Sequence, residues 1–274
     1  MPTISDDESA KSKIQRFSVE EIHLYAVSDA IVLAKRNLMR YVRLPSLLVF
    51  STIQPVIFLL LFTYVFGGAV RGLHTTYVEF LIPGILVQTV AFGSAQTGIG
   101  LAEDLQSGII DRFRSLPMAR SAVLAGRTLA DTMRNLFVVL IMVSAGYVIG
   151  FRFQHGIFNA VLVVVLAVLF GFALSWISAF IGVSVKNSES ANVAGFIWIF
   201  PLTFASGAFV PVSTMPSWLQ VFANANPITN SVDALRALTV GGPVGDYLIY
   251  TAMWIVGLVS VFAPLAIWRY KIRS

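Results

Sequence analysis

The sequence contains no cysteine and only three histidines in 274 residues. The lack of cysteine excludes disulfide bonds and thiolate metal sites, and His23, His74 and His155 lie too far apart in sequence to suggest a metal-binding motif. Charged residues are also scarce, at 12% against roughly 25% in soluble domains. Because 57% of the residues are hydrophobic, a soluble fold could not cover the apolar surface, and the composition predicts an integral membrane protein.

Motifs for catalysis are missing as well. The sequence has no G-x-x-x-x-G-K-[ST], H-E-x-x-H or G-x-S-x-G. Charges are nearly absent from the interiors of the apolar stretches, where ion-coupled carriers place Asp, Glu or His. Glu79, Asp131 and Arg134 fall near predicted span ends, where they can snorkel to the interface, and we interpret them as structural. The chain is therefore predicted to bind no metal or cofactor itself, and the energy for any transport must come from another protein.

Six stretches are long and apolar enough to cross a membrane, which requires roughly 20 residues. The predicted fold is therefore an all-α integral membrane domain over residues 22–274, with six transmembrane helices. The fifth span contains Pro201 and Gly207 and is predicted to be kinked or broken. The predicted spans are residues 47–68, 80–101, 129–151, 157–183, 193–210 and 247–268.

Basic residues are distributed unevenly about these spans. Residues 1–21 are polar and mixed in charge, unlike a signal peptide, and are interpreted as a flexible cytoplasmic arm. Of the 19 Lys and Arg residues, 16 fall on the side of the two termini, and only Arg71, Arg152 and Arg236 fall on the other. This excess predicts a multi-pass protein of the bacterial inner membrane with both termini in the cytoplasm. The net charge of +5 is accordingly interpreted as a topology signal and not as a nucleic-acid site.

Residues 22–44 are predicted to form an amphipathic helix before the first span. An apolar stripe beside a span has lipid available, so this helix is expected to lie in the headgroup region with its arginines on anionic lipid. The alternative is an ordinary solvated helix. The predicted apolar face carries Val27, Ile31, Leu38 and Val42, and the charged face carries Asp29, Arg36, Arg40 and Arg43.

Residues 211–245, on the predicted external side, form a second informative segment. Residues 227–238 are predicted to be a helix that starts at Pro227 and pairs Asp233 with Arg236 one turn later. Pro216 and Trp218 precede it, within an apolar segment that is too short to span a bilayer. A helical pair that dips back into the outer leaflet explains these features, and an exposed loop is the alternative.

Residues 103–134 are predicted to be a compact cytoplasmic loop, broken by Gly108 and Pro117. A short helix within it would present an apolar ridge with charged flanks, which suits docking into a groove of a soluble partner. The alternative is a solvated loop that carries only the topology signal. The ridge consists of Ile109, Ile110, Phe113 and Leu116, and the flanks of Asp111, Arg112 and Arg114.

Within this loop, GIIDRFRSLPMARSAVLAGRTLAD resembles the cytoplasmic loop of type-2 ABC exporter permeases, most closely those of the daunorubicin/doxorubicin-resistance branch. Three other segments are similar to the same family: YVEFLIPGILVQ, GYVIGFRF and FVPVSTMPSWLQVFANANPITNSVDALRAL. The resemblance covers nearly the whole chain from about Arg36.

The resemblance implies an assembly of two six-span subunits, where the second is another copy or a close paralogue, above two ATPase subunits that hold ATP and Mg. Residues 22–44 would be the interface helix and residues 216–238 the external re-entrant pair. The substrate would pass between the first, second and fifth spans of the two copies. The coupling helix that presses on the ATPase would contain Gly108, Asp111, Arg112, Arg114, Pro117 and Arg120.

The leading hypothesis is an export permease for a hydrophobic or amphipathic molecule, either a drug or a lipid-like product. Aromatic residues of the second and fifth spans would line its pathway, or would pack against lipid. A membrane-embedded lipid-modifying enzyme would require a cluster of polar residues at one membrane depth, and none stands out in the sequence. A membrane scaffold without transport is the third possibility. The aromatic residues are Phe92, Phe196, Trp198, Phe200, Phe204 and Phe209.

Overall fold

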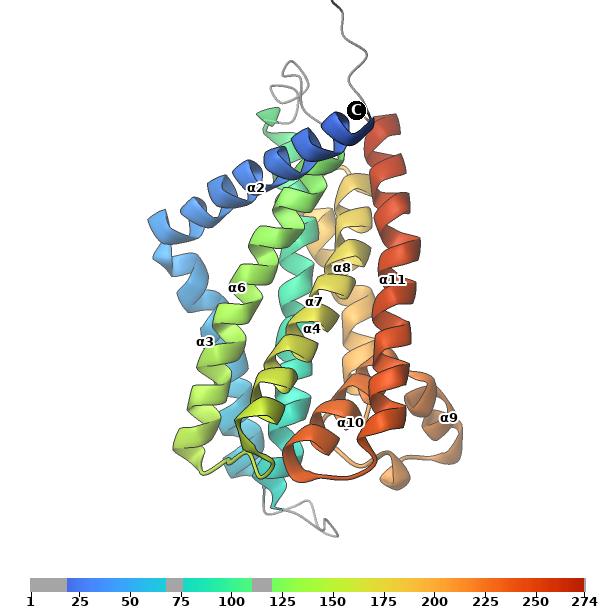
Figure 1. Ribbon diagram of the computed structural model, residues 1–274. Coiled ribbons are helices and arrows are strands. Elements are labelled where there is room, and N and C mark those ends of the chain that lie inside the picture. The colour runs from blue at the N-terminus through green and yellow to red at the C-terminus, as the bar shows by residue number, and fades with distance from the viewer. Residues whose placement is uncertain (1–18, 68–75, 110–119, 274) are drawn as a thin grey trace, which may run out of the picture.

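The computed structural model describes residues 19–67, 76–109 and 120–273, and every regular element within them is a helix. The four longest helices that run along the bundle are α4 (Tyr77–Gln106), α6 (Arg120–Ile149), α7 (Gly156–Ser184) and α11 (Val244–Arg273) (Figure 1). Each is long and apolar enough to cross a membrane. They confirm helices at the second, third, fourth and sixth predicted spans, although α6 begins nine residues earlier than expected.

The first and fifth predicted spans contain shorter α-helices than expected. α3 (Pro45–Leu61) continues as a π-helix, η1 (Phe62–Phe66), and α8 covers Ser188–Phe204. α3 and α8 have 17 residues each, or about 26 Å of helix against a hydrocarbon core of about 30 Å. α8 ends where the chain turns to meet the next segment: the Gly207 N–H donates to Thr229 Oγ1 at 3.0 Å. Residues 205–210, predicted as part of a span, therefore form this turn.

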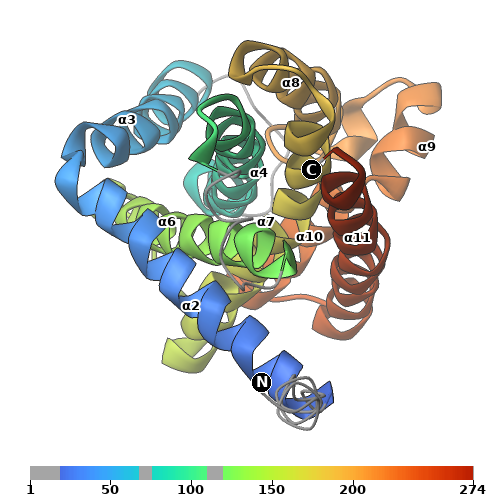
Figure 2. The ribbon, with the colours of Figure 1, turned by 90° about the horizontal axis from the view of Figure 1, so that it is seen from above.

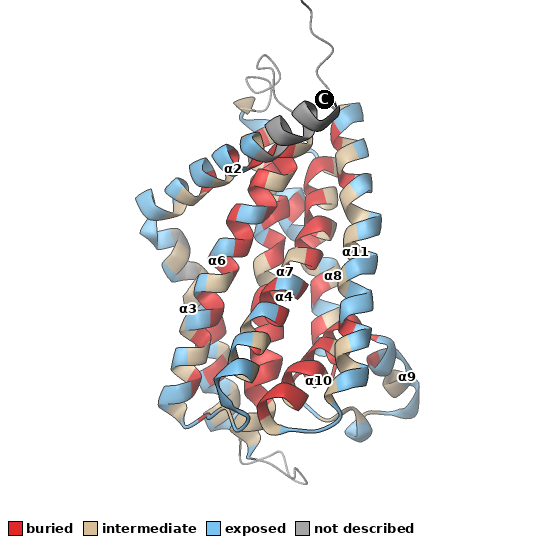
Figure 3. Cartoon of the chain, in the orientation of Figure 1, coloured by how far each residue is buried: buried red, intermediate tan, exposed pale blue. Residues whose placement is uncertain are grey.

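α4 is the central helix of the bundle, with α3, α6, α7 and α8 around it (Figure 2). The buried residues concentrate on α4, α7 and the inner face of α6, whereas α11 exposes apolar residues on the outside (Figure 3). The backbones of α4 and α7 approach closely, since a Cβ on Gly182 would lie 2.3 Å from the Gly98 carbonyl oxygen. Only glycine allows this approach, because a Cβ at this position would overlap the facing backbone.

α2 (Val19–Arg43) lies across one end of the bundle against α6, and the C-terminal end of α11 lies at the same end (Figure 1). The helix predicted at residues 22–44 is confirmed, and Ile31 and Val42 of its predicted apolar face point away from the bundle. Ala30, Leu33 and Asn37 are buried against the bundle. Ile31 and Val42, which were expected to face lipid, are 58% and 68% exposed. α2 thus has one stripe buried against protein and a separate apolar stripe directed away from it, and contact of that stripe with lipid stays a prediction.

The opposite end of the bundle holds η2 (Val212–Thr214), α9 (Ser217–Ala225) and α10 (Pro227–Val240) (Figure 1). The predicted helix with a proline start is confirmed: Pro227 is its first residue, and Asn226 Oδ1 accepts the Ile228 N–H at 2.9 Å. α10 is largely buried, whereas α9 exposes Trp218 and Val221. The helical pair is present, and its depth in the bilayer stays a prediction.

The predicted loop at residues 103–134 is helical at both ends, because α4 extends to Gln106 and α6 begins at Arg120. Gly108 was expected inside a coupling helix, but it forms the turn after α4 with a φ of +70°. This left-handed conformation favours glycine because it has no Cβ. Asp111, Arg112, Arg114 and Pro117 lie outside the described residues.

Candidate functional site

A cluster of charged residues is buried where α2, α4 and α6 meet, and we call it the charge cluster. It consists of Arg127, Asp131 and Arg134 of α6, Asp104 of α4 and Tyr41 of α2. The spacing i, i+4, i+7 places the three α6 residues on one helix face. The prediction that Asp131 and Arg134 snorkel to the interface is wrong, because Asp131 has no exposed surface and Arg134 is buried.

Asp131 is the centre of this cluster. Its Oδ2 lies 3.1 Å from Arg127 Nε and its Oδ1 lies 3.6 Å from Arg134 Nη1. The Tyr41 hydroxyl donates a short hydrogen bond to Asp131 Oδ1. Arg127 Nη1 also lies 3.9 Å from Asp104 Oδ2 on α4. Two guanidinium groups and two carboxylates thus balance one another, which is the condition for keeping charges away from water.

Tyr41 ties α2 to this cluster. Burial, assisted by the negative charge of Asp131, raises the pKa of the Tyr41 hydroxyl to about 12. The phenol therefore stays protonated at neutral pH and can keep donating to the carboxylate. The α2 helix consequently depends on a polar contact, as well as on apolar packing, for its position on α6.

Two of the three arginines of the predicted interface helix pair with protein. Arg40 Nη2 lies 3.1 Å from Glu103 Oε2, and Arg36 Nη2 lies 3.7 Å from Asp104 Oδ2. The expectation that these arginines rest on anionic lipid is therefore replaced, for Arg36 and Arg40, by ion pairs to the end of α4. Arg43 is exposed.

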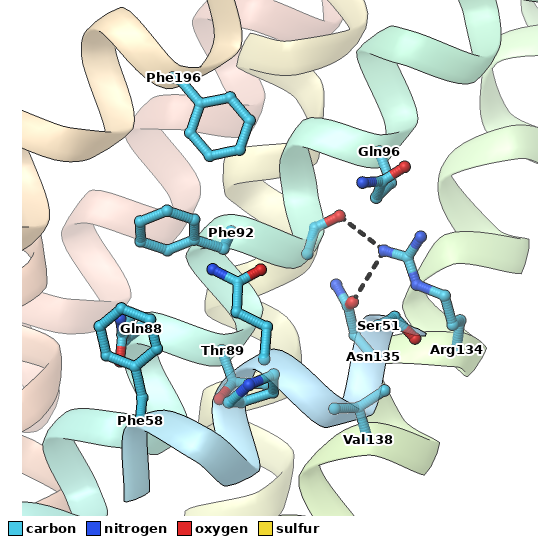
Figure 4. Close-up of a pocket in the computed structure, with 13 residues that line it drawn as sticks. Ser51, Phe58, Gln88, Thr89, Phe92, Gln96, Arg134, Asn135, Val138 and Phe196 are labelled. Atoms are coloured by element: carbon cyan, nitrogen blue, oxygen red, sulfur yellow. Dashed lines mark hydrogen bonds between the residues drawn. The ribbon is translucent and has the colours of Figure 1, made fainter. Parts of the chain in front are cut away.

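Next to the charge cluster lies a cavity of about 60 Å³ between α3, α4, α6 and α8, which we call the amide pocket. Figure 4 shows Phe92 and Phe196 on one side of it and Arg134 and Asn135 on another. This polar group at one depth of the bundle was not expected from the sequence. Its side-chain amides come from Gln54, Gln88, Gln96 and Asn135, and its aromatic rings from Phe58, Phe92 and Phe196.

Of the aromatic residues predicted to line a pathway, the five phenylalanines lie together, whereas Trp198 packs against the hydrophobic core. The ring centroids of Phe92 and Phe200 are 5.3 Å apart, and those of Phe200 and Phe204 are 5.4 Å apart. We call the continuous row of rings the aromatic ladder. From the amide pocket it leads to two partly exposed side chains, since Phe200 is 45% and Phe204 43% exposed. The ladder consists of Phe196, Phe92, Phe200, Phe204, Phe209, Phe62 and Phe58.

Arg236 in α10 joins three segments at the other end of the bundle. Its Nη1 lies 3.1 Å from Asp233 Oδ1, as the predicted pair requires. Its Nε and Nη2 donate to the carbonyl oxygens of Phe80 and Ala208 at 3.0 and 3.2 Å. Burial lowers the pKa of Arg236 to about 10, so it remains a cation at neutral pH. These contacts assign Arg236 and Asp233 to holding α10 in place, while Pro216 precedes α9 and Trp218 is exposed on it.

Among the residues that the structure describes, no group of His, Cys, Asp and Glu side chains is arranged to hold a metal ion. The arrangement instead offers a mutually neutralised ion cluster, a polar pocket lined mainly by neutral amides and hydroxyls, and an aromatic surface, inside a bundle of apolar helices. This is a multi-pass membrane protein with an amphipathic interior site.

Comparison with known proteins identifies the family. Residues 29–240 match the model of the ABC-2 type transporter family, and the chain belongs to that family. It is similar to a daunorubicin resistance ABC transporter permease, DrrB1, of Streptomyces coeruleorubidus, with 36% identity over 91% of this chain and 88% of that protein. A probable doxorubicin resistance ABC transporter permease, DrrC, of Mycobacterium tuberculosis shares 26% identity over 88% of both chains. The resemblance noted in the sequence is thereby confirmed.

Proposed function

We propose that the chain is the membrane permease subunit of an ATP-driven exporter that moves a hydrophobic or amphipathic molecule, such as a drug or a lipid-like product. The single observation that carries this proposal is the aromatic ladder leading into the amide pocket. An apolar surface with a few placed polar groups is the usual composition of a small-molecule site. The drug-resistance permeases similar to this chain support the same class of cargo.

We further propose that the protein works with two ATPase subunits, which hold ATP and Mg, and with a second copy or close paralogue of itself. The predicted coupling segment follows α4 and precedes α6, so two of the three helices that carry the charge cluster adjoin it directly in the chain. α2 would be the interface helix, and α9 with α10 the external re-entrant pair. In this arrangement both termini are cytoplasmic, and the substrate passes along the first, second and fifth spans.

The alternative of a membrane-embedded lipid-modifying enzyme predicted a polar cluster at one depth, and such a cluster is present. Its charged groups, however, form ion pairs with one another. Asp131 pairs with Arg127 and Arg134 and accepts a hydrogen bond from the Tyr41 hydroxyl. A general acid or nucleophile needs a group free to act on substrate. The geometry therefore favours a structural role for the charges over catalysis.

Transport by inside-out membrane vesicles tests the proposal. Vesicles that contain this chain and its ATPase partner should accumulate doxorubicin in an ATP-dependent manner, and vesicles that contain the ATPase alone should not. Modification of lipid without any accumulation of doxorubicin would indicate the membrane-embedded enzyme. The absence of both activities would indicate the membrane scaffold. A screen of further amphipathic compounds on the same vesicles covers a cargo other than doxorubicin.

A further inference from the structure

Gln88 is a buried polar residue whose hydrogen bonding is incomplete. It belongs to the central helix α4, is 3% exposed, and its Oε1 has no hydrogen-bond partner among the described residues. Burying an amide oxygen without a partner is unfavourable, and a bound group that supplies the missing hydrogen bond would remove this cost. Gln88 lines the amide pocket, and rotation about its terminal torsion, which is a soft one, can present either amide atom to a group in the pocket.

The polar wall around Gln88 carries no free charge. Arg134 is the only cation among the described residues that line it, and its Nη2 already donates to the Gly93 carbonyl oxygen at 2.6 Å and to Asn135 Oδ1 at 3.0 Å. The charge of Arg134 is balanced by Asp131 behind it. The remaining polar lining consists of neutral amides and hydroxyls, which both donate and accept hydrogen bonds. Such a wall suits an uncharged hydroxyl or amide group better than an ion.

The size of the pocket limits what enters it. Its volume of about 60 Å³ is far below the roughly 300–1,000 Å³ of sites that enclose a drug-sized molecule. Phe92 and Phe196 line the pocket and also begin the aromatic ladder, which continues to the partly exposed rings of Phe200 and Phe204. Flat rings stack favourably on such surfaces. A ligand can therefore place its rings on the ladder and a single small substituent in the pocket.

We infer that the amide pocket, within one subunit, binds an uncharged hydrogen-bonding substituent of an aromatic cargo, with Gln88 as its main polar partner. This inference rests on the proposed export function, which supplies the cargo. It specifies the cargo as a flat aromatic molecule that carries a neutral hydroxyl or amide group, and it disfavours a cationic amine at this position.

Three fluorescent probes with the same rings test the inference: pyrene, hydroxymethylpyrene and aminomethylpyrene, which is cationic. Binding to the full chain in lipid nanodiscs is measured against empty nanodiscs, which removes partition into lipid. Loss of one neutral hydrogen bond should weaken hydroxymethylpyrene binding about five- to tenfold in Gln88→Leu, with pyrene unchanged. Thr251→Val is the matched control, because Thr251 is also fully buried with an unpartnered hydroxyl but lies in α11, away from the pocket.

An equal loss for pyrene and hydroxymethylpyrene in Gln88→Leu would overturn the inference, since Gln88 would then only shape the wall. Preferred binding of aminomethylpyrene by the wild type, or no saturable binding of any probe, would overturn it as well. ATP-dependent uptake of the probes by inside-out vesicles separates the two proposals. Gln88-dependent binding without uptake would refute the exporter and keep the pocket, whereas uptake indifferent to Gln88→Leu would refute the pocket and keep the exporter.

Discussion

Replacing Asp131 with asparagine removes the negative centre of the charge cluster while keeping the shape of the side chain. Asp131 is fully buried and lies within 3.1 and 3.6 Å of two guanidinium groups. Without its charge, Arg127 keeps the more distant Asp104, and Arg134 loses the carboxylate that lies beside it. Breaking a buried ion pair by removing one partner typically costs about 3–5 kcal/mol, so we expect Asp131→Asn to lower the free energy of unfolding by that amount.

Tyr41→Phe provides the internal comparison, because it leaves the charges in place and removes the hydroxyl that donates to Asp131 and accepts from Arg134 Nη1 at 3.3 Å. A hydrogen bond to a charged group contributes about 1.5–3 kcal/mol, so this variant should be less destabilised than Asp131→Asn. Both free energies of unfolding can be measured by titrating purified protein from mild detergent into SDS. Asp246→Asn, at an exposed carboxylate in the first turn of α11, is the matched control and should change stability by less than about 1 kcal/mol. The reasoning fails if Asp131→Asn is no worse than this control, because the cluster would then be well hydrated.

Three further outcomes follow from the sequence and the fold. Reporter fusions at Gly72 and at Ser274 should report opposite sides of the membrane, and reports from the same side would contradict the six-span topology. Arg112→Ala and Arg114→Ala should reduce co-purification of the ATPase, since losing one partner of a desolvated interfacial pair costs about 2–5 kcal/mol; full recovery with normal transport would leave only a topology signal. Phe204→Ala, which truncates a half-exposed ring of the aromatic ladder, should change substrate preference in transport assays more than expression, and the reverse result would assign the ring to packing.

Local sequence signals were sufficient to predict those structural features that depend on residues close together in the chain. The start of α10 at Pro227 and the Asp233–Arg236 pair were both predicted, because a proline at the first helical position and a pair one turn apart are local features. Hydrophobicity over about 20 residues likewise located a helix at each of the six predicted spans. The same criterion placed the end of α8 too late, at residue 210 instead of Phe204, because Asn226 and Thr229, residues outside the span, decide where its chain turns away.

The charge cluster was missed because its depth depends on where α6 begins. With a span starting at residue 129, Asp131 lies in the first turn and can reach water. In the structure α6 starts at Arg120, so Asp131 is roughly 16 Å along the helix. The spacing of Arg127, Asp131 and Arg134 was an available signal, but their partners Tyr41 and Asp104 come from other helices. Nor did periodicity reveal the second stripe on α2, formed by Ala30, Leu33 and Asn37, which packs against protein.

The charge cluster and the amide pocket share one residue, Arg134. Its Nη1 pairs with Asp131 and donates to the Tyr41 hydroxyl. Its Nη2 donates to the Gly93 carbonyl oxygen and to Asn135 Oδ1 in the pocket wall. Binding sites need side chains whose own positions are fixed by surrounding contacts. Here that support comes from an ion cluster that also anchors α2 and the end of α4, immediately before the predicted coupling segment. A displacement of α2 against α6 must therefore change the contacts of Arg134, and with them the polar wall of the pocket.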